Sequence, residues 1–156
     1  MKINVIAVGK IKENYFKDAI GEYAKRLSRF CDFNIIEVDE YRNTKDTAEE
    51  INITKNIEGD RLIKKLRGCV IVTDRSGIMF SSEELAEKMR NVTTGGISEI
   101  SFVIGGSNGL SKAVLDRADA VISFGKVTYP HQLMRVILTE QIYRAFTINS
   151  SIKYHK

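Results

Sequence analysis

The sequence predicts a single α/β domain over residues 1–156, built on a mostly parallel sheet with helices on both faces. Five short β-prone runs alternate with stretches of helical periodicity along the chain, which is the pattern of such a sheet. The third run, CVIVTD (Cys69–Asp74), is dominated by apolar residues, as expected of a central parallel strand covered on both faces. The RSG tripeptide after it is expected to turn the chain. A length of 156 residues suffices for one core.

The N-terminal half predicts two strands separated by a helix. The strands are expected at Ile3–Gly9 and Phe33–Val38, where β-branched residues are concentrated. Between them, Asn14–Phe30 carries apolar side chains at intervals of three and four residues, which indicates an amphipathic helix. The polar stretch Asp39–Asn56 predicts an exposed loop that passes into a second helix. The buried side of that helix is expected to comprise Ile57, Leu62, Ile63 and Leu66.

The C-terminal half continues the alternation. Residues 81–90, SSEELAEKMR, predict a helix that begins with a serine cap and ends with basic residues. A fourth strand is expected at Ile100–Gly106, followed by a short helix capped by Ser111. The fifth strand is expected at Ala120–Gly125. Pro130 then opens the last helix, because proline is favoured at the first helical position.

The composition limits the kinds of binding partner and the cell compartment that we expect for this protein. The net charge of +4 and pI near 9.0 permit a polyanionic partner, although a solvated basic surface explains them equally well. Two cysteines, Cys31 and Cys69, and two histidines without a C-x-x-C motif favour neither a disulfide framework nor a metal site. No apolar run approaches the ~20 residues that span a bilayer. We therefore expect a cytoplasmic protein with no membrane or DNA partner.

Three strand ends are candidates for a ligand site, because open α/β sheets bind ligands at the carboxyl ends of their strands. They are Thr73-Asp74, Gly105-Gly106 and Phe124-Gly125. The turn GGSNGLSK lacks the spacing of a P-loop and of a dinucleotide fingerprint, so it is not a phosphate loop of either kind. Together with the loop FGKVTYP it suits a purine with a small polar tail. The alternative is that these are only tight strand-to-helix turns.

Four stretches carry a family resemblance: KINVIAVGK, FVIGGSNGL, KVTYPHQLMRVILTEQIYRAF and the closing YHK. They resemble the ribosomal large-subunit methyltransferase H family of the SPOUT superfamily, and the resemblance covers the whole chain. It implies methylation of ring nitrogen three of a pseudouridine in 23S rRNA, with S-adenosylmethionine as the methyl donor. It also implies action on the assembled ribosome, a homodimer and a C-terminal trefoil knot.

The resemblance also implies the cofactor residues. They are Thr73, Gly105, Phe124, Gly125, Lys126, Val127, Thr128 and Tyr129. Two of these positions depart from the family pattern, since relatives commonly carry leucine at position 73 and serine at position 125. The Gly105 turn is expected to let the chain lie close against adenosine.

Residues near the last helix and the tail are candidates for the substrate site. His131 and Arg135 are expected beside the pocket, to contact the substrate or its charge. The alternatives are a structural histidine, and a salt bridge between Arg135 and an acid such as Glu140. The basic, aromatic tail at residues 153–156 suits base stacking and phosphate binding, although composition alone favours a disordered end. The resemblance makes Tyr154 and His155 the expected catalytic residues, with Lys153 as a substrate contact.

The last helix is apolar on nearly all sides, which predicts a self-complementary dimer with the active site near its interface. One subunit's tail is then expected to reach the other's pocket. Two rival functions remain open from the sequence. One is a SPOUT-like enzyme that acts on another RNA, such as tRNA. The other is a degenerate module that binds nucleotide or RNA without catalysis.

Overall fold

The computed structural model describes residues 1–43 and 45–154, and it confirms the α/β fold with a parallel sheet. The strand order is β2-β1-β4-β3-β5, and every neighbouring pair runs parallel. β1 and its two neighbours share one register, in which Lys2 lies opposite both Asp32 and Glu99. The strands are β1 (Lys2–Val8), β2 (Asp32–Val38), β3 (Cys69–Met79), β4 (Glu99–Ile104) and β5 (Ala120–Ser123).

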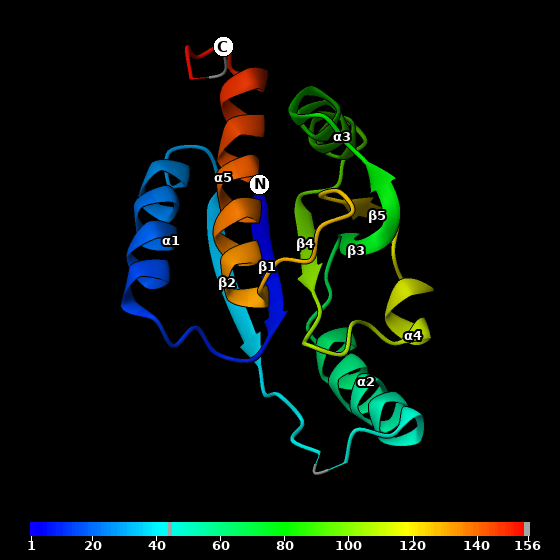
Figure 1. Ribbon diagram of the computed structural model, residues 1–156. Helices are drawn as coiled ribbons and strands as arrows, with labels where there is room; N and C mark the ends of the chain where they lie inside the picture. Colours follow the sequence, from blue (N-terminus) through cyan, green and yellow to red (C-terminus); the bar gives the residue numbers. More distant parts are fainter. Residues whose placement is uncertain (44, 155–156) are drawn as a thin grey trace.

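Helices cover the two faces of the sheet. The long helix α5 lies between α1 and α3 and contacts both on one face, while α2 and α4 pack together on the other (Figure 1). The helices are α1 (Asn14–Leu27), α2 (Ala48–Ile63), α3 (Ser82–Thr94), α4 (Lys112–Leu115) and α5 (His131–Asn149). Within the described residues, no helix is both long enough and apolar enough to cross a membrane.

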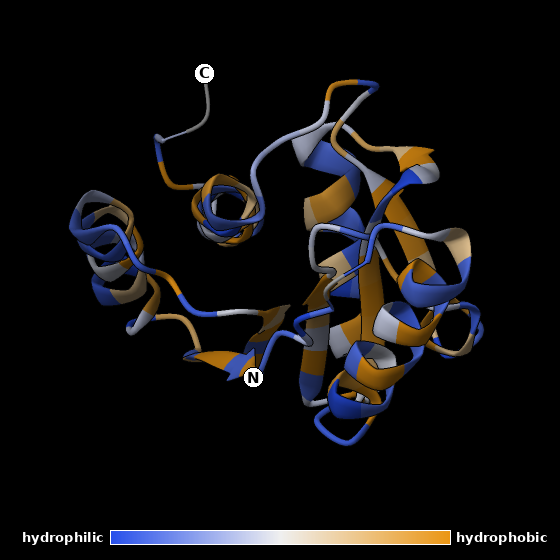
Figure 2. Cartoon of the chain, turned by 60° about the horizontal axis from the view of Figure 1, so that its bottom comes forward, coloured by the Kyte–Doolittle hydropathy of each residue, from blue (hydrophilic) through white to orange (hydrophobic). Residues whose placement is uncertain are grey.

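Each face of the sheet has its own hydrophobic core. Side chains such as Ile3, Phe102 and Leu138 form the core beneath α1, α3 and α5. Val8 and Val72 point to the opposite face and pack with residues of α2 and α4. The alternation follows from the pleat of a strand, which sends successive side chains to opposite faces. In Figure 2 the strands are mainly orange, while the helices carry both orange and blue residues.

The second helix differs from its expected form. It begins at Ala48, well inside the stretch expected to be a loop, because Thr47 caps it by accepting a hydrogen bond from the Glu50 amide. Its buried side includes two polar residues, Thr54 and Glu58. Leu62 is buried as expected, whereas Ile57 and Ile63 are only half-buried. The charged stretch Asp39–Asn56 is otherwise mostly exposed, and Thr54 is the one fully buried residue among those of the stretch that the structure describes.

Other boundaries shift by a few residues. The first helix ends at Leu27 rather than Phe30, and the third runs on to Thr94, so its last turn carries no basic residue. Ser81 is the serine that caps α3, with a reciprocal hydrogen bond from its own amide to Glu84. Pro130 precedes the first residue of α5 rather than occupying it. The RSG turn lies inside β3, where pairing with β5 shifts register.

Candidate cofactor and active site

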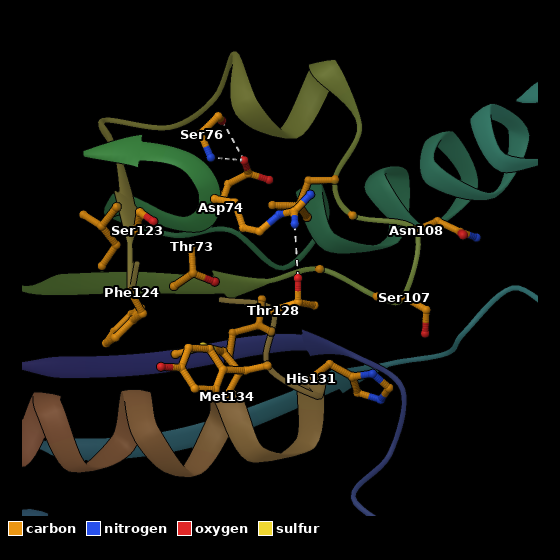
Figure 3. A pocket seen from close by; sticks show the side chains of 18 of the residues that line it. Thr73, Asp74, Ser76, Ser107, Asn108, Ser123, Phe124, Thr128, His131 and Met134 are labelled. Carbon is orange, nitrogen blue, oxygen red and sulfur yellow. Dashed lines mark hydrogen bonds between the residues drawn. The ribbon is translucent and has the colours of Figure 1, made fainter. Parts of the chain in front are cut away.

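A cavity of about 600 Å³ opens where β4 and β5 end and where the pairing of β3 with β5 shifts register. Three segments form most of its wall: one lies at this irregularity inside β3, and the other two end and follow β4 and β5 (Figure 3). They are residues 73–76, residues 104–110, and residues 122–129 without Lys126. His131 and Met134 of α5, Lys55 of α2 and Leu115 of α4 complete it. The volume lies within the roughly 300–1,000 Å³ of small-molecule sites.

The glycine turn after β4 leaves no room for side chains. A Cβ atom at position 105 would lie 2.9 Å from Leu110 Cγ, and one at Gly106 would lie 2.8 Å from Glu58 Oε2. Glu58 is buried behind the turn, and its other carboxylate oxygen accepts a hydrogen bond from the Tyr41 amide at 3.0 Å. Burial raises the pKa of Glu58. The turn is thus braced by α2 on one side and presents bare backbone to the cavity on the other.

The two positions that depart from the family pattern have structural reasons. The Thr73 hydroxyl donates to the Val103 carbonyl at 2.9 Å, so it ties β3 to β4. Gly125 has φ +106°, a left-handed conformation that strains any residue with a side chain. Its amide donates to the Ser123 hydroxyl at 3.2 Å, which holds the turn after β5. The backbone conformation therefore favours glycine at position 125, whereas the space around it would admit a side chain.

Seven of the eight expected cofactor residues line this one cavity, although they come from three strands far apart in sequence. They are Thr73, Gly105, Phe124, Gly125, Val127, Thr128 and Tyr129. The exception is Lys126, which is exposed and not part of the cavity wall. The arrangement brings these residues together, while their contacts with a cofactor stay a prediction.

His131 lines the cavity from the first residue of α5 and is half-buried. Burial lowers the pKa of His131, and the positive charge of Arg135 lowers it further. The imidazole is therefore neutral at neutral pH and keeps a nitrogen that can accept a proton.

Arg135 does not face the cavity, and the expectation that it contacts the substrate is wrong. Its side chain is completely buried and donates to the carbonyls of Val8 at 2.6 Å and Gly9 at 2.8 Å. It forms an ion pair with Glu37 at 2.9 Å, not with Glu140. The guanidinium fixes the start of α5 to the ends of β1 and β2, and it therefore holds the His131 turn in place.

Comparison with known proteins identifies the family. A family model described as "Predicted SPOUT methyltransferase" matches residues 1–155. The chain belongs to the SPOUT methyltransferase family. It is 55% identical to a protein of Lactobacillus helveticus and 51% identical to one of Levilactobacillus brevis, over 100% of each chain. Both relatives are named Ribosomal RNA large subunit methyltransferase H.

Solved structures of other methyltransferases share the fold of this SPOUT methyltransferase. A probable methylase family protein of Haemophilus influenzae has a TM-score of 0.53 at 15% identity, covering 99% of this chain and 70% of its own. A methyltransferase of Legionella pneumophila with bound cofactor SAM has a TM-score of 0.50 at 10% identity, covering 94% and 66%. At such low identity these likenesses establish the fold alone.

The tail of this SPOUT methyltransferase lies far from its own cavity. The cavity is at the first turn of α5, and the tail follows the last turn, 19 residues later. At 1.5 Å per residue the helix separates them by roughly 28 Å. Lys153 is exposed there and Tyr154 is half-buried. His155, the other expected catalytic residue, lies outside the described residues.

Tyr154 is held by its own subunit. Its hydroxyl donates to Glu140 Oε1 at 3.1 Å, its ring meets the edge of Tyr143, and the Arg144 guanidinium lies 4.8 Å from its ring centroid. Burial raises the pKa of Tyr154, and hydrogen bonds to Tyr23 and Glu140 raise it further. The phenol therefore keeps its proton at physiological pH, so it can donate a hydrogen bond but cannot act as a base.

Several residues that line the cavity were not predicted as site residues. Arg75 is the clearest, because it directly follows the Thr73-Asp74 pair that the sequence already marked as a candidate ligand site. Its signal in the sequence is a charge next to that pair. Lys55 had no such signal, because its position at the cavity depends on how α2 packs against the glycine turn.

Proposed function

We propose that this SPOUT methyltransferase uses S-adenosylmethionine to methylate ring nitrogen three of a pseudouridine in 23S rRNA. It acts on the assembled ribosome, in the cytoplasm, as a homodimer. The observation that carries the substrate class is the full-length identity of 50 to 55% to proteins named Ribosomal RNA large subunit methyltransferase H. The net charge of +4 suits a polyanionic partner.

The fold fits this proposal. The proposal takes residues 1–156 as one domain. The chain leaves β5 beside β3 and returns over the sheet as α5, between α1 and α3 (Figure 1). That return is compatible with the trefoil knot implied by the resemblance, and the knot belongs to the proposal.

The cavity fits the cofactor in shape and in donor set. Gly105 and Gly106 line the cavity without side chains, so a flat adenine can approach their backbone closely. Phe124 and Tyr129 supply aromatic surface, while Gly125, Val127 and Thr128 supply backbone donors and acceptors. When bound, S-adenosylmethionine supplies an electrophilic methyl group. The role of the protein is to hold the acceptor base in line with that group, within roughly 3–3.5 Å.

The target nitrogen loses a proton as its bond to the methyl carbon forms, so the site must receive or disperse that proton. His131 is the candidate acceptor within the described cavity, because it is neutral at neutral pH. Tyr154 and His155 position the substrate in this proposal. Tyr154 contributes a hydrogen-bond donor and a stacking surface, and Lys153 contributes a cation for phosphate.

The distance of roughly 28 Å along α5 means that the tail and the cavity of one chain cannot act on the same base. A complete site therefore needs the tail of a second copy. This requirement is the structural support for the homodimer.

The decisive experiment is transfer of labelled methyl from S-adenosylmethionine to ribosomes that lack the modification. Free large subunits and tRNA are assayed in parallel, and mass spectrometry locates the product. We expect label on a large-subunit pseudouridine, strongest with assembled ribosomes. Fully modified ribosomes and an exposed-surface variant, Arg90→Gln, are the controls. Label on tRNA would replace the proposed substrate, and no label from a folded protein that binds S-adenosylmethionine would indicate a non-catalytic module.

A further inference from the structure

Two adjacent residues of opposite charge, Asp74 and Arg75, lie inside β3 and line the cavity. Neighbouring residues of a regular strand face opposite sides of the sheet. Here the pairing of β3 with β5 shifts register between Thr73 and Ile78, and such an irregularity re-aims side chains. Both charges therefore face the same space. Asp74 is the one carboxylate among the described residues of the cavity wall.

The Asp74 carboxylate is held in a fixed orientation. Its Oδ1 accepts hydrogen bonds from the Ser76 amide at 2.8 Å and from the Ser76 hydroxyl at 2.6 Å (Figure 3). Oδ2 takes part in neither bond. One oxygen thus anchors the loop, and the other is left to meet a ligand.

Arg75 connects two parts of the cavity wall. Its Nη1 donates to the Thr128 hydroxyl at 3.1 Å, and this bond links the irregular part of β3 to the loop after β5 (Figure 3). A neutral hydroxyl does not compensate the positive charge, and the bond uses one of five guanidinium donors. In residues 1–43 and 45–154, neither Arg75 nor Asp74 forms an ion pair.

A carboxylate beside a guanidinium matches the two ends of an amino-acid zwitterion. The carboxylate accepts hydrogen bonds from an α-ammonium, and the guanidinium donates to an α-carboxylate in a charge-assisted pair. A phosphate fits less well, because Asp74 would repel it. We infer that Asp74 and Arg75 form the subsite for the methionyl end of the cofactor, with Asp74 at its ammonium and Arg75 at its carboxylate. This inference rests on the proposed use of S-adenosylmethionine.

Calorimetry with two ligands tests this subsite without any methyl transfer. S-adenosylhomocysteine carries the amino-acid end, and 5′-methylthioadenosine keeps the adenosine but lacks that end. We expect Arg75→Gln and Asp74→Asn each to weaken binding of S-adenosylhomocysteine about tenfold or more, because each removes a charged partner. Binding of methylthioadenosine should change less than about twofold, since it makes neither contact. Asp74→Asn keeps an oxygen for Ser76, so it preserves the loop.

Two further variants complete the test. Arg75→Lys keeps the charge and should recover part of the lost affinity for S-adenosylhomocysteine. Arg90→Gln removes one positive charge from the surface of α3 and should leave the affinity for both ligands unchanged. If Arg75→Gln weakens both ligands equally, or neither, the subsite is overturned while the proposed cofactor stands. If it spares S-adenosylhomocysteine but weakens ribosome binding, Arg75 binds phosphate instead. If the wild-type protein binds neither ligand, both the subsite and the proposed use of S-adenosylmethionine are refuted.

Discussion

Replacing Arg135 by methionine tests whether this residue is structural. The side chain is completely buried, and three hydrogen bonds would be lost: those to the Val8 carbonyl, the Gly9 carbonyl and Glu37. Each buried carbonyl left without a donor costs roughly 1–3 kcal/mol. Glu37 is 30% exposed, so its carboxylate can turn toward water and adds little to the cost. The buried Nε of Arg135 has no hydrogen-bond partner in the wild-type protein, and this reduces the contribution of Arg135 to the free energy of unfolding. We expect a loss of about 3 kcal/mol in the free energy of unfolding.

Urea unfolding followed by circular dichroism measures this loss. For a chain of this length, about 3 kcal/mol lowers the melting temperature by roughly 6–12 °C. The matched control is Arg90→Met on the exposed side of α3. Its free energy of unfolding should stay within about 0.5 kcal/mol of the wild-type value. If Arg135→Met also stayed within about 0.5 kcal/mol and instead lowered affinity for ribosomes, the residue would be a substrate contact and the structural argument would fail.

Three further predictions follow from buried groups. Folding lowers the pKa of His131, so its neutral form contributes stability that is present above the unfolded pKa of 6.5 and is lost as pH falls below it. His131→Gln should flatten this part of the profile of unfolding free energy against pH, measured with urea. An unchanged profile would contradict the lowered pKa of His131. Gly105→Ala should displace the glycine turn and weaken calorimetric binding of S-adenosylhomocysteine by roughly tenfold or more, since the overpacking costs about 1–3 kcal/mol; an unchanged affinity would show that the turn does not approach the ligand. Burial raises the pKa of Cys31 to about 11 and also raises that of Cys69, so both thiols should react with Ellman's reagent only after unfolding, and rapid reaction of the native protein would show that they are accessible.

The elements of the fold could be predicted because their signals are local. The apolar strand at Cys69–Asp74 and the serine caps at Ser81 and Ser111 each depend on residues a few positions away. The three strand ends also converge on one cavity, as parallel strands require. Strand order could not be predicted in the same way, since β1 lies between β2 and β4 through contacts that no short stretch of sequence encodes.

The wrong expectation for Arg135 and the missed burial of Glu58 have the same cause: both residues contact partners that lie far away in the sequence. Arg135 and Glu37 are 98 positions apart, and nothing near either residue indicates their pairing. Glu140 was the nearer acid, but it pairs with Arg144 one helical turn later. The buried carboxyl of Glu58 was missed for the same reason, because its burial depends on the glycine turn packing against α2.

In the proposed homodimer, the length of α5 makes activity depend on protein concentration. If the cavity of one chain is completed by the tail of another, dilution below the dissociation constant of the dimer should lower the specific activity rather than the total alone. Two inactive variants, one defective at Gly105 and one at Tyr154, should then restore each other when mixed. Random reassortment would give each mixed dimer one intact site, or about a quarter of all sites.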